Sequence, residues 1–216
     1  MFRVARGIVV GAAMVAALTA CGGADGGSPG ATDGGDGAGA VTGGGGQPKV
    51  PVVLTEDQVR RALVDTGSAP QDWEGFGVSI PEHTESVKTC QDDTGTKCGG
   101  FTALGTSHID QVAGEGQVIF TIYAFRTPDD VKFAMKSLVA KERRKSGAGA
   151  KPLKVSAGAD ETDAFTGRNT EIFMRLGGSL IRVASEGLRE GQPYADFARL
   201  QIDRIKQTAE GKNPDL

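Results

Sequence analysis

Val118-Ile-Phe-Thr-Ile-Tyr-Ala-Phe125 is the strongest strand signal in the chain. Apolar or aromatic side chains occupy most positions on both of its alternating faces. That pattern is typical of a strand whose two faces are both packed against other elements. We therefore expect this stretch to lie in the middle of a sheet, with at least part of each face covered.

A hairpin is predicted further along the chain, where two alternating stretches flank Gly177-Gly178. Two glycines at this place favour a two-residue type I′ turn. We expect the apolar face of this hairpin to pack on the core, and Arg182 on the mixed face to tolerate substitution. The register gives these pairs: Ile172 with Val183 and Met174 with Ile181 on the apolar face, Phe173 with Arg182 and Arg175 with Leu180 on the mixed face.

Helix signals separate the strands. A capping box at Thr55–Gln58 starts a helix that runs to about Val64. Thr127-Pro128-Asp129-Asp130 starts a second helix with a cap, a proline and two acids in its first turn. The order of elements predicts an α+β domain, an antiparallel sheet packed by about three helices. The remaining elements are strands at Gly99–Leu104 and Leu153–Val155, a loop around Gly158–Asp163, and an amphipathic helix from Tyr194 to near Gly211.

Composition divides the chain into three parts. It has 216 residues, a formal net charge of −3 and 33 glycines, many of which lie between Gly22 and Gly46. A mildly acidic chain gives no reason to expect a nucleic-acid partner. The glycine-rich stretch lacks apolar periodicity and is predicted to be a flexible tether. The organisation expected is a signal peptide at residues 1–20, an anchor and tether at 21–52, and an extracytoplasmic domain at 53–216.

The N-terminus carries the features of an export signal. Arg3 and Arg6 precede an uncharged run, Gly7–Leu18, which is shorter than the ~20 apolar residues of a membrane-spanning helix. Leu18-Thr19-Ala20-Cys21 resembles the bacterial lipobox. The resemblance implies cleavage before Cys21 and diacylglyceryl transfer to its thiol, so that lipid on Cys21 holds the protein to the outer side of the cell membrane. An ordinary secretory signal with a chance cysteine is the alternative.

Two further cysteines, Cys90 and Cys98, follow in the predicted domain. In an extracytoplasmic protein the simplest interpretation of two remaining cysteines is a disulfide bond between them. A redox-active pair is the alternative, but the C-x-x-C spacing of such pairs is absent.

Signals for chemistry are few. Ser107 and His108, in Gly105-Thr-Ser-His-Ile109, match half of a nucleophile elbow, which leaves an envelope hydrolase as an alternative function. His83 is expected in a loop. The acidic loops Asp92–Gly95 and Asp160–Asp163 do not follow a calcium-binding pattern. We therefore expect no catalytic residues, no bound metal and no cofactor.

Two aromatic residues and one basic segment are candidates for binding. Trp73 and Phe76 lie among glycines and are candidate ligand-binding residues, although a role in the core is the alternative. Lys141–Lys145 ends the second helix. This segment is either a solvated helix end or a contact with anionic lipid or wall polymer.

A family resemblance joins these features. The lipobox, the tether and Tyr123-Ala-Phe125-Arg-Thr-Pro-Asp-Asp130 before a helix resemble an actinobacterial envelope lipoprotein. Most of Leu54–Gly211 is similar in outline to the extracellular sensor domain of PknH-type kinases. The resemblance implies a domain that binds a ligand or a partner in a groove beside the sheet. Our leading interpretation is a non-enzymatic surface protein whose domain binds a small ligand or an envelope protein. The third possibility is a structural component of an envelope complex, with an exposed apolar patch around Phe133.

Overall fold

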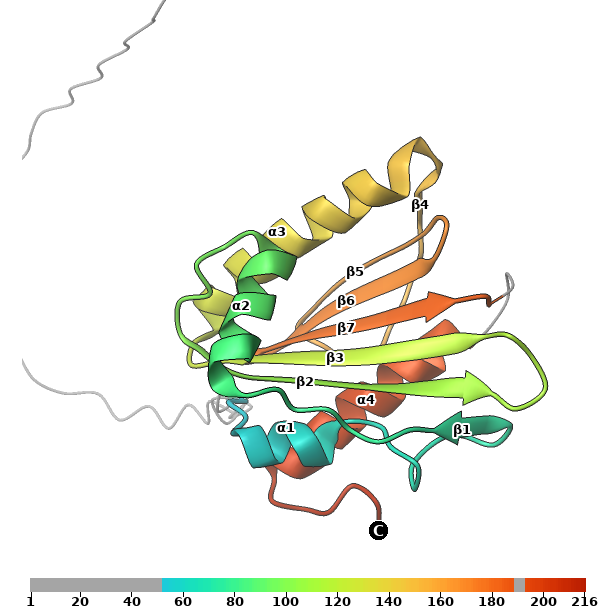
Figure 1. Ribbon diagram of the computed structural model, residues 1–216, viewed down its shortest axis with the longest axis horizontal. Helices are drawn as coiled ribbons and strands as arrows, with labels where there is room; N and C mark the ends of the chain where they lie inside the picture. The colour runs from blue at the N-terminus through green and yellow to red at the C-terminus, as the bar shows by residue number, and fades with distance from the viewer. Residues whose placement is uncertain (1–51, 189–192) are drawn as a thin grey trace, which may run out of the picture. The chain divides into compact units, whose positions relative to one another are not determined.

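The computed structural model describes residues 52–188 and 193–216, which fall within one compact unit. The predicted signal peptide, Cys21 and nearly all of the predicted tether lie outside the described residues. Within those residues, four α-helices pack on one antiparallel sheet of seven strands (Figure 1). The predicted α+β class is confirmed, with one helix more than expected. No helix among the described residues has the length and apolar content needed to cross a membrane.

The sheet has the spatial order β1-β2-β3-β7-β6-β5-β4, and every neighbouring pair is antiparallel. β3 therefore lies inside the sheet, between β2 and β7, as its sequence predicts. The strands are β1 (Trp73–Gly75), β2 (Phe101–Gln111), β3 (Gln117–Phe125), β4 (Lys151–Pro152), β5 (Glu161–Thr166), β6 (Thr170–Leu176) and β7 (Ser179–Glu186).

Helices cover both faces of the sheet. α1 and α4 pack on one face, and α2 and α3 pack on the other (Figure 1). The predicted capping box at the start of α1 is formed, and Thr127 caps α3 as expected. The helices are α1 (Glu56–Ala62), α2 (His83–Thr94), α3 (Pro128–Ser146) and α4 (Tyr194–Ala209), with a short 3₁₀ turn, η1 (Gly147–Gly149), after α3.

β3 contributes to two cores, one on each side of the sheet. Phe120 and Ile122 belong to the cluster under α1 and α4, whereas Tyr123 and Phe125 belong to the cluster under α2 and α3. Ile119 is only half-buried, although it lies on an interior strand. The second face of β3 is therefore covered over part of its length, which confirms the sequence interpretation.

The β6–β7 hairpin has the predicted register at all four pairs, including Met174 with Ile181 and Phe173 with Arg182. The turn differs from the prediction, because Gly177 has a positive φ of 56° and Gly178 does not. A type I′ turn requires a positive φ at both central residues. The turn requires a residue without a side chain at position 177, because a Cβ atom on Gly177 would overlap the backbone of Val52.

α2 is the helix that the sequence did not predict. Its buried side chains are Ser86, Cys90 and Thr94, so it carries no apolar stripe that would reveal its period. No side chain caps its first turn. His83, expected in a loop, is its first residue.

Strand boundaries also differ from the expectation. β2 extends to Gln111 instead of ending near Leu104. β5 occupies part of the segment predicted as a loop around Gly158–Asp163. Only two of its residues, Ala164 and Phe165, are buried, so an alternating apolar pattern does not reveal the strand. β4 precedes the predicted strand at Leu153–Val155.

Arg204 of α4 is buried against the carboxyl end of α1. Its guanidinium donates to the backbone carbonyls of Arg61 at 3.0 Å, Ala62 at 3.2 Å and Leu63 at 2.9 Å, and it pairs with Asp215 at 2.6 Å. These contacts satisfy carbonyls that the end of a helix leaves without partners, and they place a cation at its negative end.

Candidate functional site

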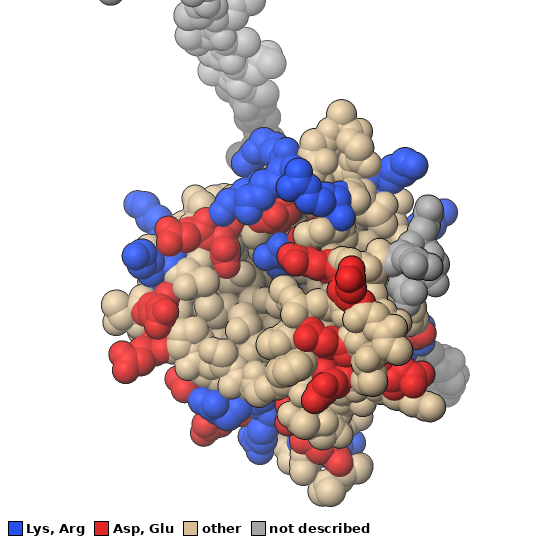
Figure 2. Space-filling view, turned by 45° about the vertical axis from the view of Figure 1, so that its right-hand side comes forward, with Lys and Arg blue, Asp and Glu red and all other residues tan. Residues whose placement is uncertain are grey.

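The helices on the α2/α3 side leave part of the sheet uncovered. α2 packs against β2, and α3 packs against β6 and β7 (Figure 1). The two helices also contact each other. Beyond them, side chains of neighbouring strands stand side by side in the register of the sheet. We call this surface the open face; its residues are Thr106, His108, Ile119, Thr121, Arg182 and Ala184. Figure 2 shows a shallow hollow with uncharged atoms at its floor and acidic and basic side chains around it.

Arg182 is the fixed charge of the open face. Its Nε and Nη2 donate to the two carboxylate oxygens of Glu171 at 2.8 Å and 2.7 Å. Glu142 of α3 lies 3.8 Å from the same guanidinium and accepts a hydrogen bond from Lys145 at 2.7 Å. Glu171 is 5% exposed and Glu142 is 7% exposed. Arg182 is therefore the main partner of a buried carboxylate, and not the surface residue without a partner that the expectation of tolerance assumed.

The pKa of Arg182 reflects this setting. Burial lowers the pKa of Arg182, but the hydrogen bonds that Arg182 donates to Glu171 and the charges of Glu171 and Glu142 outweigh burial and raise the pKa above its ordinary value. The side chain consequently stays cationic at any pH at which the protein is folded.

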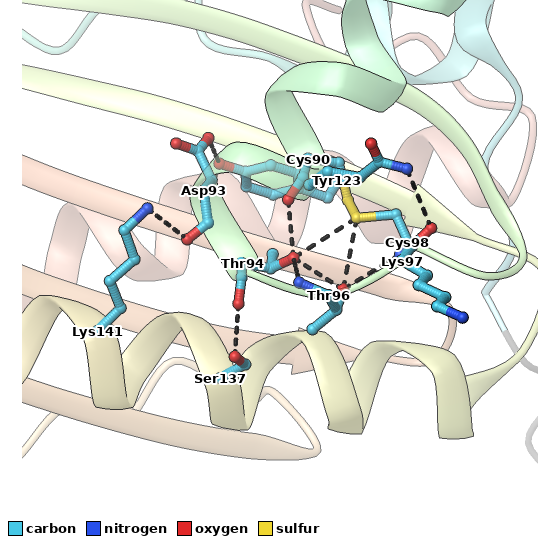
Figure 3. The surroundings of a disulfide bond; sticks show 10 residues. Cys90, Asp93, Thr94, Thr96, Lys97, Cys98, Tyr123, Ser137 and Lys141 are labelled. Atoms are coloured by element: carbon cyan, nitrogen blue, oxygen red, sulfur yellow. Dashed lines mark hydrogen bonds between the residues drawn. A yellow bond between two sulfur atoms is a disulfide. The ribbon is translucent and has the colours of Figure 1, made fainter.

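Tyr123 and Asp93 join β3 to α2 beside the open face. The Tyr123 hydroxyl is buried and donates to Asp93 Oδ2 at 2.6 Å. Burial raises the pKa of Tyr123 well above its ordinary value, and the Asp93 carboxylate raises it further. Lys141 of α3 donates to the Asp93 carbonyl at 3.0 Å, so the end of α2 is fixed from two directions (Figure 3).

The predicted disulfide is present between Cys90 and Cys98, whose Cα atoms are 6.3 Å apart. Both residues are buried, and the hydroxyls of Thr94 and Thr96 lie against the sulfur of Cys98 (Figure 3). The bond links α2 to the chain just before β2. Its position supports a structural role, since the thiols have little access to solvent.

Trp73 and Phe76, the predicted ligand-binding residues, lie on opposite sides of the sheet. The Trp73 ring meets Phe197 of α4 edge to face, with ring centroids 4.9 Å apart, and packs against the core under α1 and α4. The Phe76 ring stacks on His108 at 4.5 Å. Only Phe76 therefore borders the open face, and the two residues cannot line one pocket together.

Ser107 and His108, the residues of the hydrolase alternative, are neighbours on β2, so their side chains point to opposite faces of the sheet. His108 lies on the open face, whereas Ser107 is 3% exposed, and its hydroxyl has no hydrogen-bond partner among the described residues. A nucleophile and its base must lie within hydrogen-bond distance. These two side chains do not form such a pair.

No family model matches the chain, and no curated protein matches its sequence. By structure, the chain is similar to the extracellular domain of PknH from Mycobacterium tuberculosis, known from a crystal structure. The TM-score is 0.48 and the sequence identity is 14%, over 72% of this chain and 98% of that one. At this level of likeness, nothing about function passes from that protein to this chain.

Phe133 lies beside a cavity of about 560 Å³ between the start of α3 and the chain after α2. Phe133 is 68% exposed, whereas the alternative of a structural component is favoured by a large exposed apolar patch around it. Lys97, Asp129 and Asp130 also line the cavity, so this surface is mixed. The described residues hold no group of three or more His, Cys, Asp or Glu side chains placed to bind a metal ion.

Proposed function

We propose that the chain is a lipid-anchored protein whose extracytoplasmic domain binds a small ligand or an envelope protein on the open face and catalyses no reaction. The observation that carries this proposal is the uncovered middle of the sheet. Ile119 lies on an interior strand, yet it is only half-buried and belongs to neither core cluster of the described residues.

The chemistry of the open face suits binding. Ile119 and Thr106 are half-buried and offer an apolar side chain and a hydroxyl, while Ala184 and Thr121 lie buried beside them in the register of the sheet. Arg182 adds a cation whose position is fixed by Glu171. Ligand sites in proteins combine an apolar surface with a few fixed polar groups in this way.

The anchor and the location are proposed from the sequence. Leu18–Cys21 fits a lipobox, and the Cys90–Cys98 bond suits an oxidising compartment outside the cytoplasm. The hydrolase alternative lacks support, because Ser107 and His108 lie on opposite faces of the sheet.

Replacing Cys21 with Ser is expected to release the protein from membranes or to leave it as an uncleaved precursor. The hydroxyl of serine cannot form the thioether through which lipid is attached, and stable anchoring requires more than one acyl chain. Fractionation of cells and intact-mass measurement test this expectation. Normal processing together with membrane retention of the variant would contradict the proposed anchor.

Replacing Ile119 with Glu is expected to remove whatever the open face binds, because the carboxylate introduces a charge at the centre of its apolar surface. Native mass spectrometry of the full chain, extracted from its own membranes, measures any mass bound to the wild-type protein. Val112→Glu is the matched control, since Val112 is 69% exposed on the β2–β3 turn. The binding proposal fails if Ile119→Glu and Val112→Glu retain the same bound mass.

A further inference from the structure

A second cavity, of about 510 Å³, lies at the far end of the sheet from α2. It is formed by η1, β4, the β5–β6 turn, the end of β7 and the start of α4. The charged residues among its described lining are Lys151 and Arg168, and both are cations. A cavity of this volume accommodates a small organic ligand such as a sugar.

Neither cation has a neutralising partner within the described part of the chain. The side chains of Lys151 and Arg168 are exposed and make no hydrogen bond or ion pair with another described residue. A third cation without a partner in the described part of the chain, Arg144, lies in the last turn of α3. The end of α3 adjoins this site, since a Cβ atom on Gly167 would lie 3.2 Å from the Cβ of Ser146.

The other basic side chains near the end of α3 bind partners within the domain. Lys141 binds carbonyls at the end of α2, Arg143 pairs with Asp163 at 2.6 Å, and Lys145 pairs with Glu142 at 2.7 Å. Figure 2 shows Lys and Arg side chains gathered at the top of the domain, over the end of α3. The excess of positive charge is notable because the whole chain has a formal net charge of −3.

The uncharged part of the lining offers hydrogen-bonding groups that suit hydroxyls. Thr166 and Asn169 are half-buried in this lining and carry a hydroxyl and an amide, and the buried Thr170 and Ser185 also border the cavity. Two cations placed near such groups match a ligand that carries a phosphate on a hydroxyl-rich ring, because the phosphate takes charge-assisted hydrogen bonds and the ring hydroxyls take neutral ones.

We propose that this cavity binds a phosphorylated polyol through Lys151 and Arg168, either as a free molecule or as the headgroup of a lipid. The open face, on the α2/α3 side, takes no part in this site. The proposal also does not depend on lipid at Cys21, so it stands or falls separately from the proposed function.

Isothermal titration tests the proposal with myo-inositol 1-phosphate and the full chain carrying Cys21→Ser. Adding Lys151→Gln and Arg168→Gln is expected to weaken binding at least about tenfold, since two charge-assisted contacts are lost. The matched control adds Lys88→Gln and Arg126→Gln, which remove the same charge from exposed positions elsewhere. The control is expected to change binding by less than about twofold.

Three results would overturn the proposal: no binding of myo-inositol 1-phosphate, equal loss in the two double variants, or equal affinity for inorganic phosphate. The last result would show that the polyol is not recognised. Cosedimentation with phosphatidylcholine vesicles that contain phosphatidylinositol distinguishes the sources. Binding to these vesicles that depends on Lys151 and Arg168 assigns the ligand to a lipid headgroup, and binding of the soluble phosphate alone assigns it to a free molecule.

Discussion

Replacing Ile181 with Asp is expected to unfold the domain at room temperature. Ile181 lies on the central strand β7, between Ile122 of β3 and Met174 of β6, and all three side chains are fully buried. A carboxylate placed there has no partner, and its burial costs several kcal/mol. That cost is comparable with the whole free energy of unfolding of an ordinary domain, about 5–15 kcal/mol.

Ile119→Asp is the matched control for this prediction. It makes the same chemical change on the neighbouring strand β3, but on the half-buried open face, where water reaches the new carboxylate. Denaturant midpoints and circular dichroism should show a folded Ile119→Asp protein and an unfolded Ile181→Asp protein. If Ile119→Asp were the more damaging variant, the assignment of the packed and open faces of the sheet would be wrong.

Replacing Arg182 with Met is expected to lower the free energy of unfolding by about 3–5 kcal/mol, the usual effect of removing one partner of a buried ion pair. Methionine retains much of the length of the arginine side chain but leaves the Glu171 carboxylate buried without its two hydrogen bonds. Arg126→Met is the control, because Arg126 is exposed, and its expected effect is within about 0.5 kcal/mol.

A double variant separates the ion pair from simple packing. Arg182→Met combined with Glu171→Met replaces both charges, and buried pairs replaced by apolar residues are often close to neutral in stability. The double variant should therefore be clearly more stable than Arg182→Met alone, as a double-mutant cycle from urea denaturation would measure. Equal stability of the two proteins would mean that Glu171 does not depend on Arg182.

The contrast between Ile181 and Arg182 shows how far the sequence reaches. Alternation and the Gly177-Gly178 turn predict the register of β6 and β7, because the period of a strand assigns every side chain to a face. The same pattern describes Arg182 only as a member of a mixed face. Its second carboxylate partner, Glu142, comes from α3, and no local pattern predicts which helix residue will reach a given strand.

The same limit explains the misplaced elements. α2 buries small polar side chains and a cysteine, so periodicity of apolar residues does not reveal it. Gly105–Ile109 resembles an active-site turn in sequence, yet it lies inside β2, because the strand continues through the glycine. The open face is predictable only in part: alternation places Ile119 and Thr121 on one face, but it does not show that Ile119 stays half-buried while Thr121 is buried.

The hydrogen bonds from Arg204 to the carboxyl end of α1 have a consequence for the order in which the domain folds. α1 has seven residues, too few for a helix to persist alone in water. The residue that satisfies its carbonyl end lies 142 positions later in the sequence. Because a ribosome makes the amino-terminal part first, α1 must wait for nearly the whole domain to be synthesised before it gains this support. Such long-range closure slows folding, so α1 gains its full support only once the last helix of the domain is in place.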